Sequence, residues 1–204
     1  MFKKTNKDIL REELVDLCIE SFKHRKGQKI DLLTLPSAWW NFEKILVKKL
    51  RESKESLFFY TTACEKNPKV FKLAASNMPR TDRSLKYDFS EKYQAQRLAS
   101  NVSTLYYTDI FDYIRETNMT FDFVWLDLMT SLNHFDTKLH YLERCTKKDS
   151  LVSITFIKGR DGQKYVGKRK IIVVKMMASI GFDLILEADY YDTSPMIQLT
   201  FKRK

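Results

Sequence analysis

Several features that would point at once to a class of function are missing from this chain of 204 residues. Its apolar runs fall short of the roughly 18 residues that a membrane-spanning helix requires. The N-terminal segment Met1-Phe-Lys-Lys-Thr-Asn-Lys-Asp8 does not lead into the apolar stretch of a signal peptide. We therefore expect a soluble, cytoplasmic protein with no membrane partner.

The motifs of several enzyme classes are absent as well. There is no glycine-rich phosphate loop followed by Lys and Ser or Thr, no GxSxG elbow and no HExxH motif. Ser/His/Asp and Cys/His dyads stay open, but no pattern favours one. The few cysteines form no CxxC pair, which indicates a reducing compartment and inert thiols, with neither a disulfide framework nor a metal site. The cysteines are Cys18, Cys64 and Cys145, and the histidines, which do not approach a metal-ligand spacing with them, are His24, His134 and His140.

Positive charge, by contrast, is abundant. Lys and Arg number 36 against 26 acidic residues, which gives a net charge of +10 and a pI near 9.4. Such a balance favours a polyanionic partner, usually nucleic acid, although surface charge for solubility explains it about equally well. Hydrophobic residues make up 44% and aromatic residues 13% of the chain, which is typical of a globular core.

The spacing of apolar residues predicts a regular alternation of helices and strands. A helix over 7–23 precedes a strand over 29–36, and Ser37 is placed to cap the helix that follows. Residues 80–103 are irregular, as a small helical insertion or a loop. The helix over 168–180 carries enough apolar residues to be well buried, and Gly181 ends it as a left-handed cap. The other expected strands cover 56–64, 104–108, 121–126, 151–157, 182–188 and 196–202, and the other helices 69–77, 110–116 and 134–146.

Three of the expected strands end on an acidic residue. Glu65 closes the run that begins at Phe58, Asp109 closes Leu105-Tyr-Tyr-Thr-Asp109, and Asp127 closes Phe121-Asp-Phe-Val-Trp-Leu-Asp127. The carboxyl ends of parallel strands are where open α/β sheets bind their ligands. The series therefore predicts the rim of a nucleoside-binding crevice.

This order of elements, closed by a helix, a Gly-Phe step and a β-hairpin, resembles the class I S-adenosylmethionine-dependent methyltransferases from about Gln28 to Lys204. The resemblance implies an α/β, Rossmann-like fold: a seven-stranded, mostly parallel sheet with helices on both faces and a C-terminal antiparallel β-hairpin. It implies one domain over 1–204, with an N-terminal helical extension over 1–27 and an irregular insertion over 80–103. The run Ser194-Pro-Met-Ile-Gln-Leu-Thr-Phe201 fits the family's antiparallel seventh strand.

The resemblance also implies roles for the strand-end acids. Glu65 corresponds to the acid that binds the cofactor's ribose hydroxyls, and its alternative reading is a solvated helix-start glutamate. Asp109 corresponds to the acceptor for the adenine amino group, and it also suits the N-cap of the helix that starts at Ile110. Phe111 is placed to pack on the adenine or in the core. Asp127 corresponds to the position nearest the methyl transfer, and we take it as the catalytic candidate.

Two departures from the family pattern stand out. The first strand leads into Pro36, Ser37, Ala38, Trp39 and Trp40, where the family has a glycine-rich turn that approaches the cofactor. Pro36, Ser37 and Ala38 occupy the position of that turn, and we assign them to cofactor binding. Because the glycine-rich motif is degenerate here, cofactor binding is expected to be altered or lost. Asp127 is followed by Leu-Met-Thr, and not by the Pro-Pro-aromatic step of base amino-methyltransferases, which argues against base N-methylation.

The sequence thus predicts an S-adenosylmethionine-dependent methyltransferase-like protein that acts on or binds nucleic acid. The alternative is a non-catalytic scaffold of the same fold that binds nucleic acid or a protein partner. Most basic residues are expected to be ordinary solvated charges. The loop from residue 158 to residue 170 follows the fifth strand on the crevice side and supplies the best candidates for phosphate contacts. These candidates are Lys158, Arg160, Lys168, Arg169 and Lys170, with Tyr87, Tyr93, Tyr106 and Tyr107 as candidates for base stacking.

Overall fold

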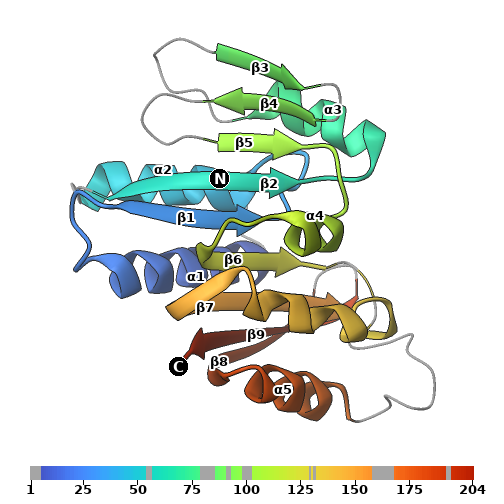
Figure 1. Ribbon diagram of the computed structural model, residues 1–204. Coiled ribbons are helices and arrows are strands. Elements are labelled where there is room, and N and C mark those ends of the chain that lie inside the picture. The colour runs from blue at the N-terminus through green and yellow to red at the C-terminus, as the bar shows by residue number, and fades with distance from the viewer. Residues whose placement is uncertain are drawn as a thin grey trace. The chain divides into compact units, whose positions relative to one another are not determined.

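The computed structural model describes residues 6–53, 57–78, 86–90, 93–97, 103–128, 130, 132–157, 168–191 and 194–204 (Figure 1). The chain divides into two compact parts. The N-terminal part comprises Arg11–Glu116, and the C-terminal part comprises Met1–Leu10 together with Thr117–Lys204. The assignment of residues 1–204 to a single domain stays a prediction.

Parallel strands form the sheet of the N-terminal part, in the order β5-β2-β1. Each strand is followed by a helix that returns the chain to the same end of the sheet, which is why the pairing is parallel. Strand and helix positions agree closely with the sequence prediction. The elements are β1 (Lys29–Thr34), α2 (Asn41–Ser53), β2 (Phe58–Cys64), α3 (Pro68–Asn77), β5 (Ser103–Tyr106) and α4 (Ile110–Glu116). The helix α1 (Asn6–Phe22) belongs to this part from Arg11 onward, and its residues up to Leu10 belong to the C-terminal part.

The helix starts of this part follow local capping rules, with one correction. Asn67 caps α3, because its side-chain oxygen accepts from the backbone N–H groups of Lys69 and Val70. Ser37 was expected to cap α2, and that prediction is wrong. The helix begins later, at Asn41, and the Ser37 hydroxyl oxygen instead accepts from the Trp39 backbone N–H at 3.3 Å, inside the preceding turn.

The segment over 80–103, expected to be irregular or helical, contains a second small sheet. β3 (Lys86–Ser90) pairs antiparallel with β4 (Tyr93–Arg97), and Lys86 lies opposite Arg97. The helical alternative is therefore wrong for these ten residues. Because the two short strands are rich in polar residues, they lack the apolar pattern by which strands are usually predicted from sequence.

The C-terminal part has four strands in the order β6-β7-β9-β8. β6 and β7 are parallel, whereas β7 with β9 and β8 with β9 are antiparallel, as the tight connection between the last two strands required. The elements are β6 (Phe121–Asp127), the 3-10 helices η1 (Leu132–His134) and η2 (Asp136–Glu143), β7 (Thr146–Ile157), α5 (Arg169–Ser179), β8 (Phe182–Tyr191) and β9 (Pro195–Arg203).

Two expectations about this part need correction, and one is confirmed. The predicted α-helix over 134–146 is a 3-10 helix, η2. The helix α5 is less buried than its apolar content suggested, since only Val173 and Met177 are buried and Ile171 is 54% exposed. Gly181, at a φ of 86°, ends α5 in the left-handed conformation that glycine adopts without strain.

The expected fold class is confirmed. The seven main strands form a mostly parallel, Rossmann-like sheet with helices on both faces and an antiparallel C-terminal hairpin, β8–β9 (Figure 1). The side chains of Cys18, Cys64 and Cys145 are buried. Burial raises the pKa of the Cys145 thiol to about 12, so this group stays protonated and unreactive. Within the described residues, no helix is long and apolar enough to cross a membrane.

Candidate functional site

The turn between β1 and α2 is built around a left-handed tryptophan. Trp40 has a φ of 54°, a value that non-glycine residues rarely adopt. Its backbone N–H donates to the Ser37 carbonyl at 3.1 Å, and its carbonyl accepts from the Lys44 N–H at 2.9 Å. Asn77, at the end of α3, donates its side-chain amide to the Ala38 carbonyl at 3.0 Å. The backbone thus makes a tight turn at the place where the sequence offers no glycine.

The side chain of Trp40 points away from this turn into the core. Its indole N–H donates to the Ala74 carbonyl in α3 at 2.7 Å, and the ring is fully buried. It belongs to a cluster that also contains Ala63, Phe71, Ala74, Met78 and Leu105, from β2, α3 and β5. Trp39 is 59% exposed. Of the two tryptophan rings after β1, one is therefore part of the core and the other faces solvent.

A buried carboxylate lies beneath the same turn. Glu43, in the first turn of α2, accepts a hydrogen bond from the Thr34 hydroxyl at 2.6 Å, and both side chains are buried. Thr34 is the last residue of β1, so this bond joins the end of the strand to the start of the helix across the turn. No pattern in the sequence indicates that Glu43 is buried, because a charged residue among lysines in a helix usually faces solvent.

Glu65 lies directly beyond the carboxyl end of β2. Its backbone N–H donates to the Tyr106 carbonyl at 3.0 Å, which extends the pairing of β2 with β5 by one residue. One carboxylate oxygen accepts from the Asn67 backbone N–H at 2.6 Å. Partial burial raises the pKa of Glu65, while the hydrogen bonds from the Asn67 and Lys66 backbones oppose that shift.

Asp109 follows β5 and uses both of its carboxylate oxygens. Oδ1 accepts from the Phe111 backbone N–H at 2.9 Å, which confirms its capping role at the start of α4. Oδ2 lies 2.8 Å from the Nζ of Lys66. This contact with Asp109 raises the pKa of Lys66. Lys66 follows Glu65 in the chain and pairs with Asp109, so it lies near both predicted binding acids, and no sequence motif indicates this role.

The aromatic candidates near these acids divide between core and surface. Phe111 is buried, so its ring is part of the core of the N-terminal part. Tyr107 is exposed, and its ring lies 5.3 Å from that of Phe71 in an edge-to-face arrangement. Tyr106 lies 5.0 Å from the ring of Tyr113. Tyr87 and Tyr93 fall on β3 and β4, and Tyr107 is the exposed one of the two tyrosines next to Asp109.

Asp127 ends β6 in the C-terminal part. One of its carboxylate oxygens lies 3.1 Å from the Nζ of Lys7, and the two side chains are only 10% and 12% exposed. Lys7 is in the first turn of α1, far from Asp127 in the sequence, so no sequence pattern indicated this pair. Asp122 is buried near the start of β6 and pairs with Lys147 at 2.8 Å, at the strand end opposite Asp127.

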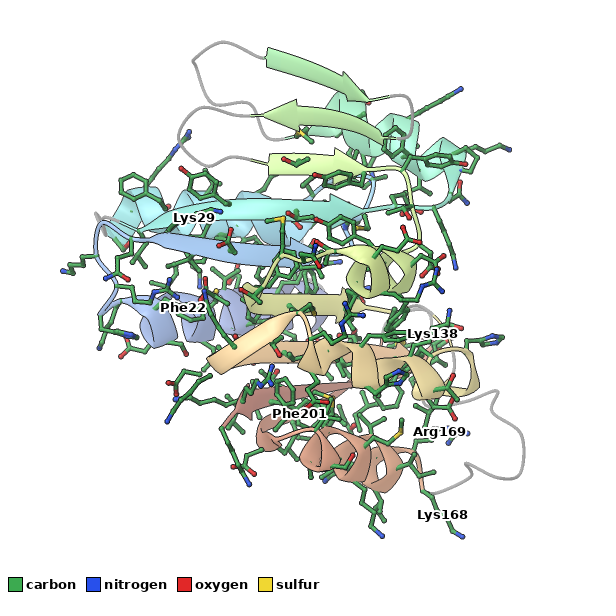
Figure 2. The ribbon with its side chains drawn as sticks, viewed as in Figure 1. Phe22, Lys29, Lys138, Lys168, Arg169 and Phe201 are labelled. Atoms are coloured by element: carbon green, nitrogen blue, oxygen red, sulfur yellow. The ribbon has the colours of Figure 1, made fainter. Side chains whose placement is uncertain are left out.

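The basic candidates after the fifth predicted strand are only partly described. Lys158 and Arg160 lie outside the described residues. Lys168, Arg169 and Lys170 lie at the start of α5, and Lys168 and Lys170 are exposed. Figure 2 labels Lys168 and Arg169 at this end of the helix. Lys170 also pairs with Glu187 on β8. Three consecutive cations at a helix start are unfavourable with the helix dipole, which is a reason to consider a functional role for them.

Neither a protein-family model nor a curated protein sequence matches the chain. Among solved structures, Trm1 from Pyrococcus horikoshii with S-adenosyl-L-methionine has a TM-score of 0.64 and 15% identity, over 100% of this chain and 56% of that one. A putative SAM-dependent methyltransferase from Streptococcus mutans has a TM-score of 0.61 and 13% identity, over 95% and 47%. Magnesium protoporphyrin IX methyltransferase from Synechocystis PCC 6803 with bound SAM has a TM-score of 0.59 and 11% identity, over 100% and 87%.

The chain has the class I S-adenosylmethionine-dependent methyltransferase fold. It spans about half the length of the first two of these structures. The positions that the sequence assigns to the cofactor are the turn after β1 and the acids after β2 and β5. All of them lie in the N-terminal part, where the Asn77 side chain donates to the Ala38 carbonyl in the turn and Lys66, which follows Glu65, pairs with Asp109. The assignment of Glu65, Asp109, Pro36, Ser37 and Ala38 to cofactor binding stays a prediction.

Substitution of Trp40 tests whether the turn depends on its ring. Trp40→Ala removes the buried indole and its hydrogen bond, and should lower the free energy of unfolding by about 3–5 kcal/mol. Trp40→Gly loses the same contacts but relieves the left-handed strain of about 1–2 kcal/mol, so it should be at least as stable as Trp40→Ala. Urea denaturation followed by circular dichroism measures both.

The exposed neighbour provides the matched control for this test. Trp39→Ala should change the free energy of unfolding by no more than about 0.5 kcal/mol. A Trp40→Gly variant clearly less stable than Trp40→Ala would contradict the left-handed conformation, since elsewhere glycine is the costlier replacement.

Proposed function

We propose that this chain binds S-adenosylmethionine and transfers its methyl group to a nucleic acid. The observation that carries the cofactor half is the position of Glu65. A partly buried carboxylate directly beyond the carboxyl end of β2, with one oxygen held by the Asn67 N–H, is suited to accept from two neighbouring ribose hydroxyls. The fold shared with S-adenosylmethionine-bound structures supports this reading.

The residues around the β1–α2 turn fit such a ligand. The left-handed Trp40 gives the backbone the sharp bend that glycine gives elsewhere, and the Trp40 ring is directed into the core. Ser37 and Ala38, the small residues of the turn, are partly exposed. We propose that backbone groups of Pro36, Ser37 and Ala38 approach the cofactor and that Glu65 holds its ribose.

Asp109 would bind the adenine amino group through lone pairs that its two existing contacts leave available. A carboxylate has about four acceptor sites on its two oxygens, so the Phe111 N–H and the Lys66 ammonium do not exhaust it. Lys66 is exposed along most of its length and can move aside without loss of packing.

When bound, S-adenosylmethionine supplies a methyl group on a positively charged sulfur, which a nucleophile of the substrate attacks. The protein then contributes mainly orientation and exclusion of water. We propose that Asp127 orients the attacking group of the substrate. Lys7 keeps the Asp127 carboxylate in a fixed position, and a nearly buried ion pair of this kind is costly to break on one side only.

The nucleic-acid half of the proposal rests on charge. The net charge of +10 attracts a polyanion at long range. Lys168, Arg169 and Lys170 gather at the start of α5, two of them exposed, and Lys158 and Arg160 precede them in the sequence. Phosphate contacts from these side chains would bring the substrate to the protein without reading its sequence.

Isothermal titration with S-adenosylmethionine tests the cofactor site. The wild-type chain should bind, and Glu65→Gln should weaken the affinity roughly tenfold or more, because the charged acceptor for the ribose hydroxyls is lost. Glu116→Gln, a change of an exposed glutamate at the end of α4, should bind like wild type. Absence of heat with the folded wild-type chain at high ligand excess would overturn the cofactor proposal and favour the scaffold alternative.

The pH dependence of binding gives an independent measure of Glu65. Burial raises its pKa from the ordinary value of 4.5, so the carboxylate begins to protonate at a higher pH than a free glutamate. Because the ionised form binds the hydroxyls, affinity should be full near pH 7 and fall as the pH is lowered through the raised pKa. Titrations at a series of acidic pH values should show this loss in wild type and not in Glu65→Gln.

Binding of nucleic acid at the start of α5 is tested by gel retardation across salt concentrations. The triple variant Lys168→Gln, Arg169→Gln, Lys170→Gln should bind more weakly and reduce the slope of log affinity against log salt by about two or three for duplex DNA. The variant Lys72→Gln, in an exposed part of α3, tests the effect of charge removal elsewhere. An equal loss per charge removed in the two variants would show that the α5 cations act only through net charge.

A further inference from the structure

The amino-terminal half of the β1–β2 pair has a sheet face that is open to solvent. Phe58 and Tyr60 point to the same side of β2, two residues apart, and are 44% and 37% exposed. Their register partners on β1 are Lys29 and Asp31, which are also at least partly exposed. From Thr61 to Cys64 the strand is buried. The open face is therefore a local feature of the first three residues of β2.

The helix α4 is much shorter than the strand β2. Figure 1 draws α4 in front of the sheet, toward the arrowheads of β1 and β2. With seven residues, α4 (Ile110–Glu116) is about 10 Å long, whereas β2, also of seven residues, extends over about 23 Å. A helix of that length covers only part of the strands. Two large rings left in water forgo burial energy, so their exposure calls for an explanation.

A cation lies beside one of the two rings, and further cations precede it in the chain. The Nζ of Lys29 lies 4.8 Å from the centre of the Tyr60 ring, and Asp31 holds that ammonium at 2.7 Å. The turn that leads into β1 carries Lys23, His24, Arg25 and Lys26 within a few residues of Lys29, and most of these side chains are exposed. Figure 2 labels Lys29 near the amino end of the strands.

The basic turn is held in place by its own contacts. Arg25 donates to the Lys29 carbonyl at 2.8 Å and to the Gln28 side-chain oxygen at 3.3 Å. Gly27, at a φ of 74°, gives the turn its left-handed step. The backbone that carries Lys26 and Lys29 is thus ordered before any ligand arrives, which lowers the entropy cost of binding.

We propose that Phe58 and Tyr60, flanked by Lys29 and the turn at Lys26, form a binding platform for single-stranded nucleic acid. Exposed rings on a sheet face stack with bases of any sequence, and cations at their border contact the phosphates. The ammonium of Lys29 and the basic side chains of the adjoining turn favour a polyanion over an apolar protein partner. The proposal shares the nucleic-acid partner of the proposed function but needs no bound cofactor.

Fluorescence anisotropy with labelled twelve-nucleotide single strands of uridine RNA and thymidine DNA tests the platform in the full chain without cofactor. Phe58→Ala and Tyr60→Ala should each weaken binding about tenfold, and the double variant further. Tyr191→Ala, which removes an exposed ring from β8, should bind like wild type. Lys26→Gln should reduce the salt slope by about 0.7, and thermal melts should show all variants folded.

The outcomes separate this proposal from the proposed function. If the wild-type chain binds and the ring variants bind equally well, the platform is overturned while nucleic acid remains the partner. If the wild-type chain binds neither strand, the platform is overturned, and the cofactor half of the proposed function is judged by titration with S-adenosylmethionine. If sedimentation shows a dimer that the double ring variant dissociates, the face is a contact between copies, and the proposal is wrong.

Discussion

The left-handed turn at Trp40 is the constraint on which the arrangement of the N-terminal part depends. Without a glycine, the bend after β1 needs a residue that tolerates strain of about 1–2 kcal/mol. A tryptophan provides the compensation, because its ring fills the space between β2, β5 and α3 and its N–H satisfies the Ala74 carbonyl. Backbone strain at the turn and packing of the core are therefore coupled in one residue.

Each of the strand-end acids already has a hydrogen-bond or ion-pair partner within the protein. Glu65 accepts from the Asn67 N–H, Asp109 from Phe111 and Lys66, and Asp127 pairs with Lys7. Such contacts fix the carboxylates in position without a ligand, at the expense of some acceptor capacity. A ligand gains from this order, since less side-chain entropy is lost on binding.

The sequence predicted those features that depend on neighbouring residues. The order of strands and helices, the cap of α4 by Asp109 and the left-handed Gly181 all follow from local patterns. What it missed depends on contacts between distant residues. Nothing near Asp127 in the sequence indicates Lys7, and an apolar helix such as α5 is buried only where another element covers it. Ser37 was the plausible cap, but the burial of the Trp40 ring fixes the start of α2.

The two ends of β2 present different chemistry. At its carboxyl end, the strand leads into the acid and capped helix start that suit a nucleoside. At its amino end, the rings of Phe58 and Tyr60 and the ammonium of Lys29 are open to solvent. Two large rings left in water forgo burial energy, so packing alone does not account for them. Binding of a ligand that stacks on the rings would recover that energy, which is why we place the proposed platform at this end of the strand.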